Sequence, residues 1–375
     1  SKSRESGNAS PYREHRETPR AISSRVFDVF GLRRHLHTQT NGSAQVRIRT
    51  TALLTILGTL TGLTPVASQG QPATQMTARP RVIVSTDIGG SDPDDFQSMV
   101  HYLVYSDRLE TEGLISSPPG TGRKAHLLET IDAYEKDYPN LVSHSSLFPA
   151  PEKLRAMSKQ GAVDPSPGAG YGEATEGSDW IIRCADSGDA RPLWILVWGS
   201  ITDIAQAVHD APRIKSRIRV YSIGSWNTSQ DPHARNCLYE NHMDLWWIES
   251  DSTFRGMYVG GDQNGDLGNS TFVAEHVRNH GALGDFFHGK KTDIKMGDSP
   301  SVLYLLFGNP GRPTDQHWGG MFRATEHGAH YWTDITDLQY REGRYDGAKT
   351  VNAWREEYLR DWQARMDWAS KRTAP

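Results

Sequence analysis

From residue 80 onward, short apolar segments alternate with amphipathic ones, and this alternation constrains the fold more than any other feature. Four apolar runs predict buried strands, at 82–84, 113–115, 193–198 and 218–223. Four segments predict helices, at 96–104, 123–137, 176–185 and 202–209. We expect Pro139 to end the second helix. Strands alternating with helices indicate an α/β fold, a mostly parallel sheet with helices on both faces.

Residues 1–77 show no such alternation and are expected to lie outside the core, whereas 78–375 are expected to form one α/β domain. Arg47 and Arg49 precede a short apolar stretch, and residues 52–68 end in small side chains, as in a secretory signal. About a dozen apolar residues are too few to span a bilayer. We therefore expect an exported protein, periplasmic or extracellular, with no stable membrane span. The alternative of an incidental loop stays open, because the stretch lies deep in the chain.

The charge distribution argues against nucleic acid as a partner. Residues 1–50 contain ten Lys and Arg against four Asp and Glu, whereas the remainder contains 31 against 41. An acidic domain lacks the basic face that binding to a phosphate backbone requires. It is compatible with a metal site built from carboxylates.

Four carboxylates, Asp87, Asp92, Asp94 and Asp95, lie within nine residues, where the first strand leads into the first helix. Neighbouring carboxylates repel one another unless a positive charge lies among them. Helix capping explains acidic residues at a helix start, but not Asp87 at the end of a strand. Ca²⁺ binds about six to eight oxygen ligands, and this loop offers several of them. The segment therefore predicts a Ca²⁺ site that is completed from elsewhere in the chain.

Three segments, in this order, resemble the nucleoside hydrolases. Residues 85–95 resemble the opening motif of that family, a strand, Thr-Asp-x-Gly, Asp-Asp and a helix. Residues 196–205 resemble its strand and Gly-Pro-Leu-Thr-Asn segment, and 297–306 resemble its late His-Asp-Pro and apolar helix. Residues 246–258 and 318–320 are similar to a bacterial branch of nucleoside-hydrolase-like proteins described as cellulose-binding or as having no known function.

The resemblance implies a metal site and a catalytic base. Asp87 would bind the metal and activate the attacking water, Asp95 would bind the metal through both oxygens, and Asp94 would contact the metal or sugar hydroxyls. The backbone carbonyl of Trp198 and the carboxylate of Asp298 would complete the Ca²⁺ site.

The chain departs from the family pattern at three places. Ser85 replaces a first Asp, and three extra residues precede Asp94, so Asp92 could exchange roles with a neighbour. Gly297 replaces the histidine that protonates the leaving base, which makes hydrolysis of ordinary nucleosides doubtful.

Polar residues that follow the strand at 218–223 are candidates for binding a sugar. Amides and carboxylates bind vicinal hydroxyls, and we expect Asn227, Glu240 and Asn241 to contact the substrate together with Asp92. Turn formation is the alternative role for the asparagines. His317 is a candidate substrate contact and one replacement for the missing acid.

We therefore expect a Ca²⁺-dependent hydrolase of an N- or O-glycosidic bond in a ribosyl or other sugar compound. Its partner would be a small sugar-containing substrate or a polysaccharide. The alternative is a non-catalytic carbohydrate-binding protein, for cellulose among others, that retains the metal site. Gly297 and Ser85 favour the alternative, whereas the full aspartate set favours catalysis. A homo-oligomer is left open.

Overall fold

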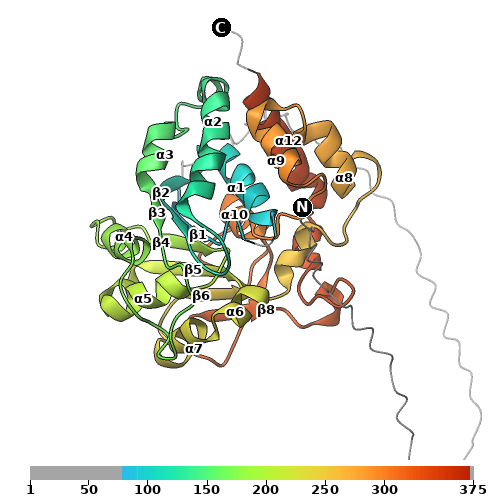
Figure 1. The fold of residues 1–375 in the computed structure, drawn as a ribbon. Coiled ribbons are helices and arrows are strands. Elements are labelled where there is room, and N and C mark those ends of the chain that lie inside the picture. The colour runs from blue at the N-terminus through green and yellow to red at the C-terminus, as the bar shows by residue number, and fades with distance from the viewer. Residues whose placement is uncertain (1–77, 91, 372–375) are drawn as a thin grey trace, which may run out of the picture. The chain divides into compact units, whose positions relative to one another are not determined.

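The computed structural model describes residues 78–90 and 92–371, which contain an eight-stranded sheet (Figure 1). The strand order is β3-β2-β1-β4-β5-β6-β8-β7, and all neighbouring strands are parallel except the antiparallel pair β7 and β8. The strands are β1 (Arg81–Thr86), β2 (Glu110–Ser116), β3 (Ser158–Gln160), β4 (Leu193–Val197), β5 (Ile218–Ile223), β6 (Trp247–Ser250), β7 (Phe322–Ala324) and β8 (Tyr331–Asp334). The expected mostly parallel α/β sheet is confirmed. The predicted N-terminal region 1–77, with its signal-like stretch 52–68, lies outside the described residues.

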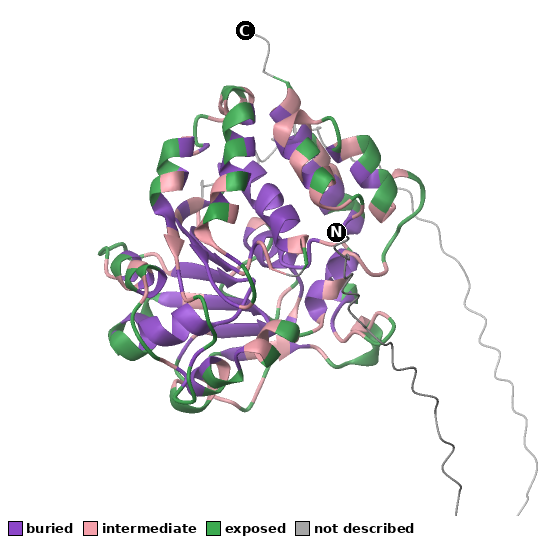
Figure 2. Cartoon of the chain, in the orientation of Figure 1, coloured by how far each residue is buried: buried purple, intermediate pink, exposed green. Residues whose placement is uncertain are grey.

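Side chains of the central strands point alternately to the two faces of the sheet, because successive residues of a strand face opposite ways. In β1, Val82 and Val84 belong to one apolar cluster and Ile83 to another. Helices that contribute to the first cluster are α1 (Asp94–Val104), α2 (Lys124–His144), α3 (Pro151–Met157), α8 (Asn269–Phe272), α9 (Gly281–Lys290), α10 (Ser299–Leu306), α11 (Lys349–Asn352) and α12 (Arg355–Ser370). Helices that contribute to the second are α4 (Glu176–Ala185), α5 (Thr202–Asp210) and α7 (Pro232–Asn241). Figure 2 shows the strands buried and the outward faces of the covering helices exposed.

Shorter elements lie in the connections. They are α6 (Trp226–Gln230), the 3-10 segments η1 (Pro212–Ser216), η2 (Thr253–Met257), η3 (Gly265–Leu267) and η5 (Leu338–Tyr340), and the π-helical segment η4 (Val273–Val277). None of the helices within 78–371 combines the length and apolar character that crossing a bilayer requires.

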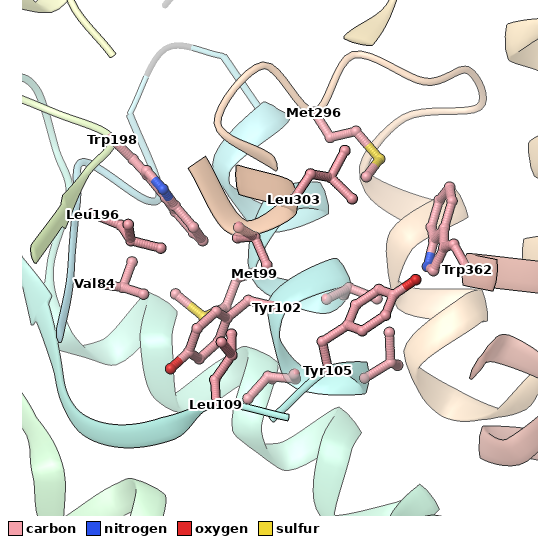
Figure 3. Close-up of a cluster of buried hydrophobic side chains, with 14 of the residues drawn as sticks. Val84, Met99, Tyr102, Tyr105, Leu109, Leu196, Trp198, Met296, Leu303 and Trp362 are labelled. Atoms are coloured by element: carbon pink, nitrogen blue, oxygen red, sulfur yellow. The ribbon is translucent and has the colours of Figure 1, made fainter. Parts of the chain in front are cut away.

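The larger cluster fixes α1 over the centre of the sheet. Figure 3 shows Val84 and Leu196 of β1 and β4 facing Met99 and Tyr102 of α1, with the indole of Trp198 entering from the end of β4. All five side chains are at most 1% exposed. Burial of each large apolar side chain stabilises the fold by about 1.5–3 kcal/mol. The first turn of α1 is thereby held at the carboxyl edge of the sheet.

The prediction that Pro139 ends the second helix is wrong. Helix α2 continues through Pro139 and ends at His144. Proline removes one N–H from the helix and leaves the carbonyl four residues earlier without its usual donor. Pro139 and Glu135 both lie on the exposed side of α2, where water can bind that carbonyl. The helix is therefore not forced to end there.

Candidate functional site

A cavity of about 250 Å³ opens at the carboxyl ends of β1, β4 and β5. In open α/β sheets, ligands bind beyond this edge of the strands. Five carboxylates line the cavity, those of Asp87, Asp92, Asp94, Asp95 and Asp298. The structure thus brings residue 298 next to the aspartate loop, more than two hundred residues away along the chain.

Glycines allow the two strand-end loops to approach each other at Asp87. Gly89 has a φ of +87°, and an added Cβ would lie 1.9 Å from Nδ1 of His126, so the turn after Asp87 requires glycine. Gly199 follows β4, and its added Cβ would lie 2.8 Å from the amide nitrogen of Asp87. This close approach places Trp198, just before Gly199, at the cavity wall beside Asp87.

Asp94 and Asp95 lie in the first turn of α1, and Asp298 is the residue that immediately precedes α10. One carboxylate oxygen from each of the three lies within 4.8 Å of the others. The Thr86 hydroxyl donates a short hydrogen bond to Oδ1 of Asp95. Two elements that are distant in sequence therefore present three carboxylates to one point.

Asp298 is held by the side chain of Trp198. The indole Nε1 of Trp198 donates to Oγ of Ser301 at 2.8 Å, and the Ser301 hydroxyl donates to the Asp298 carbonyl at 2.6 Å. Asp298 itself is 3% exposed, and its Oδ2 has no hydrogen-bond partner among the described residues. A buried carboxylate oxygen without a donor is costly unless a cation lies against it.

The pKa values of the clustered carboxyls respond to burial and to one another. Burial, with the charges of Asp94 and Asp92 acting in the same direction, raises the pKa of Asp87 to about 7. Burial and the charge of Asp92 raise the pKa of Asp94 to about 6. Burial and neighbouring carboxylates also hold the pKa values of Asp95 and Asp298 well above the usual range. A bound cation would relieve this repulsion.

The donor set fits a hard divalent cation. Asp94, Asp95 and Asp298 offer carboxylate oxygens, and the cavity-lining Trp198 offers a backbone carbonyl. Ca²⁺ prefers such oxygen ligands, and the unpartnered Oδ2 of Asp298 is the specific feature that a cation would satisfy.

Cationic and aromatic side chains that the sequence analysis did not single out also line the cavity, among them Lys295, Arg255 and Tyr258. Lys295 pairs with Asp92 through a 2.7 Å contact from Nζ to Oδ2. Arg255 of η2 donates to the hydroxyl of Tyr258 at 3.0 Å and to Oγ of Ser225 at 3.1 Å. Arg255 and Tyr258 lie in the segment 246–258 that carries part of the family resemblance, so that segment could have pointed to them.

The family model described as "Cellulose-binding Sde182, nucleoside hydrolase-like domain" matches residues 81–322. This chain belongs to that family. This nucleoside hydrolase-like domain is similar to the solved structure of a nucleoside hydrolase-related protein from Saccharophagus degradans. That protein is associated with carbohydrate metabolism. The two are 28% identical, the match covers 79% of this chain and 73% of the other, and the TM-score is 0.64.

Two solved structures of nucleoside hydrolases match less closely. An inosine-uridine preferring nucleoside hydrolase from Bacillus anthracis is 14% identical, with 76% and 99% of the two chains covered and a TM-score of 0.47. A purine-preferring ribonucleoside hydrolase from Gardnerella vaginalis is 16% identical, with 78% and 99% covered and a TM-score of 0.45. No curated protein matches the chain.

Of the substrate contacts expected in this nucleoside hydrolase-like domain, Asp92 and Asn227 line the cavity, whereas Glu240 and Asn241 do not. Helix α7 begins at Pro232, has ten residues and is therefore about 15 Å long, with Glu240 and Asn241 in its last turn. Glu240 and Asn241 are exposed at that far end, where Nδ2 of Asn241 donates to the Cys237 carbonyl at 3.1 Å.

His317 also lies outside the cavity lining. Its ring is fully buried and stacks on Tyr304 with a centroid distance of 4.1 Å. Both ring nitrogens lie 2.9 Å from backbone carbonyls, those of Asp315 and Asn309. The ring therefore packs the core rather than facing a substrate.

Gly297 lies close against the aspartate cluster of the nucleoside hydrolase-like domain. A Cβ added at Gly297 would lie 3.4 Å from Oδ2 of Asp94 and 3.3 Å from the ring of Phe254. A histidine at this position would therefore lie against the carboxylates. Among the described residues that line the cavity, none is a histidine.

Proposed function

We propose that this protein is an exported, Ca²⁺-dependent hydrolase of an N- or O-glycosidic bond in a ribosyl or other sugar compound. The observation that carries the proposal is the unpartnered, buried Oδ2 of Asp298 next to the carboxylates of Asp94 and Asp95. Structural acids are normally paired, so three converging carboxylates with one orphan oxygen favour a cation site. The description of the matching family as cellulose-binding supports a sugar ligand.

Chemistry at this site requires a base that takes a proton from the attacking water. Ca²⁺, when bound, would supply positive charge that polarises water and orients sugar hydroxyls. Asp87 lines the cavity beside the cluster and is our candidate base. Water that attacks directly from this side would invert the anomeric centre, because no covalent intermediate forms.

A second candidate is a non-catalytic carbohydrate-binding protein that retains the cation site. It is supported by the lack of a histidine among the described lining residues and by Gly297 beside Asp94. Leaving-group protonation needs an acid within hydrogen-bond reach, and we assign none.

The proposal is tested with the full chain, first stripped with EDTA and then titrated with Ca²⁺ by calorimetry. Ca²⁺ at about a hundred times its Kd should raise the free energy of unfolding by about 2.7 kcal/mol. Chromogenic glycosides and nucleosides are assayed with Ca²⁺ and with EDTA, next to a cellulose pull-down. Turnover that EDTA abolishes supports the hydrolase. Retention on cellulose without turnover supports the binding protein, and no Ca²⁺ binding contradicts both.

A further inference from the structure

Trp226 is the exception among the eleven tryptophans of the chain, all of which lie in its described part. The other ten are buried or half-buried, whereas Trp226 is 61% exposed. It also lines the cavity that contains the aspartate cluster. A large indole that is exposed within the lining of a polar cavity is free to pack against a bound ligand.

The backbone on both sides of Trp226 is held in place. Ser225 has φ 58° and ψ −107°, a backbone conformation that residues other than glycine rarely adopt. Its N–H donates to Oδ1 of Asp251 at 2.6 Å, and its Oγ accepts from Arg255 at 3.1 Å. On the other side, Nδ2 of Asn227 donates to the Trp198 carbonyl at 2.7 Å. Strained backbone that is held by several bonds is concentrated at functional sites.

We propose that Trp226 is a stacking platform for a second sugar ring, adjacent to the ring bound at the aspartate cluster. The ligand is then an oligosaccharide of at least two units, and this inference rests on the proposed function. The apolar C–H face of a pyranose ring packs on an indole, while its hydroxyls remain free to bind donors. Arg255 and the hydroxyl of Tyr258 line the same cavity and supply such donors.

The openness of this position favours a glycan over a nucleobase. Small ligands in enclosed sites lose about 70–90% of their surface on binding. An indole that is 61% exposed covers one face of its ligand and leaves the other to solvent. This geometry suits one unit of a longer chain better than a leaving base that has to be enclosed and protonated.

The test compares Trp226→Ala and Trp226→Phe with the native chain, all saturated with Ca²⁺. Glucose, cellobiose, cellotetraose and inosine are titrated by calorimetry. Trp226→Ala should weaken cellotetraose binding about tenfold and leave glucose binding unchanged, and Trp226→Phe should retain most of the affinity, since stacking is preserved. Leu338→Ala is the matched control, because Leu338 is 72% exposed and lies outside the cavity lining.

Fluorescence quenching by acrylamide provides an independent readout. Trp226 is the exposed tryptophan, so it should supply the readily quenched component, which Trp226→Phe removes and cellotetraose protects. The inference is overturned if the native chain does not bind cellotetraose, if Trp226→Ala binds it normally, or if the loss is equal for inosine. The Ca²⁺ affinity and EDTA-sensitive turnover of the native chain are measured separately, and their absence contradicts the proposed function instead.

Discussion

The side-chain amide of Asn227 donates a hydrogen bond of 2.7 Å to the backbone carbonyl of Trp198. The two residues follow β5 and β4, which are neighbours in the sheet, so this bond joins two strand-end loops at the cavity. The same nitrogen donates to the Ile223 carbonyl at 3.1 Å, which fixes the orientation of the amide. A carbonyl oxygen has two lone pairs, so that of Trp198 can accept this bond and also bind a cation.

Replacing Asn227 by Ala should therefore loosen the cavity wall. We expect the free energy of unfolding to fall by about 1–3 kcal/mol, because two buried carbonyls lose a donor. Ca²⁺ affinity should fall about tenfold, since the Trp198 carbonyl is no longer held. Urea unfolding and calorimetry measure the two effects. Asn241→Ala removes a similar amide outside the cavity and should leave Ca²⁺ affinity unchanged. Equal effects of the two substitutions would contradict the prediction.

Asp298→Ala should affect the metal-free and metal-bound states in opposite directions. Without a cation, the substitution removes a buried carboxylate that faces other carboxylates, so stability should rise by about 1 kcal/mol or more. Ca²⁺ affinity should fall at least about a hundredfold, because a ligand is lost. The control is Asp266→Ala, since Asp266 pairs with Arg360 away from the cavity. Unchanged Ca²⁺ affinity in Asp298→Ala would show that Asp298 is not a Ca²⁺ ligand.

Asp87→Asn should separate chemistry from binding. The amide keeps the shape of the side chain but is a poor proton acceptor, so kcat should fall by about 10²–10⁴. Affinity for an oligosaccharide should stay within a few-fold. Steady-state kinetics and calorimetry on the same preparation test this. Near-normal turnover of Asp87→Asn would show that Asp87 is not the catalytic base.

Two substitutions at Ser225 should differ in stability. Both Ser225→Gly and Ser225→Ala lose the hydroxyl that accepts from Arg255, but glycine adopts φ 58° without strain. The Gly variant should therefore be more stable than the Ala variant by about 1–2 kcal/mol. Urea unfolding of the two variants side by side gives the difference directly. An Ala variant of equal stability would mean that the backbone here is not strained.

The pH dependence of stability should include a contribution from Asp334 at the end of β8. Its carboxylate accepts the backbone N–H groups of Asp251 and Thr253 at 3.1 and 3.0 Å. Burial is the largest influence and raises the pKa of Asp334 from 3.8 to about 7. The folded state thus binds the proton more tightly than the unfolded state, so the stabilisation is complete below about pH 3.8 and is lost as pH rises through about 7.

Asp334→Asn does not titrate, so the native chain should lose stability relative to this variant by about 1–3 kcal/mol between pH 5 and pH 8. Unfolding by urea at both pH values, with EDTA present throughout, measures the change. A difference between the two proteins that is the same at pH 5 and pH 8 would show that Asp334 is already ionised at pH 5.

Local pattern in the sequence predicted four of the eight strands, β1, β2, β4 and β5, and the position of the aspartate loop. Strand and helix periodicity involve residues close in sequence, so the apolar run at 82–84 and the stripe at 96–104 place Asp87 and Asp95 at the junction of β1 and α1. Asp298 was found through family resemblance, and no local pattern would have joined it to Asp87. Pro139 shows the limit of local rules, since exposure on one face of α2 lets the helix continue.

Tertiary structure alone decided which other side chains reach the cavity. Asn227, Glu240 and Asn241 were all candidates in sequence, the two asparagines being favoured, but only Asn227 lines the cavity, because the other two lie in the last turn of α7, a helix about 15 Å long. Likewise, Trp226 follows β5 and lines the cavity beside carboxylates that follow β1 and precede α10, an arrangement that only the packing of these elements creates. Sequence determines what a segment can form, whereas the packing of distant segments determines what its side chains face.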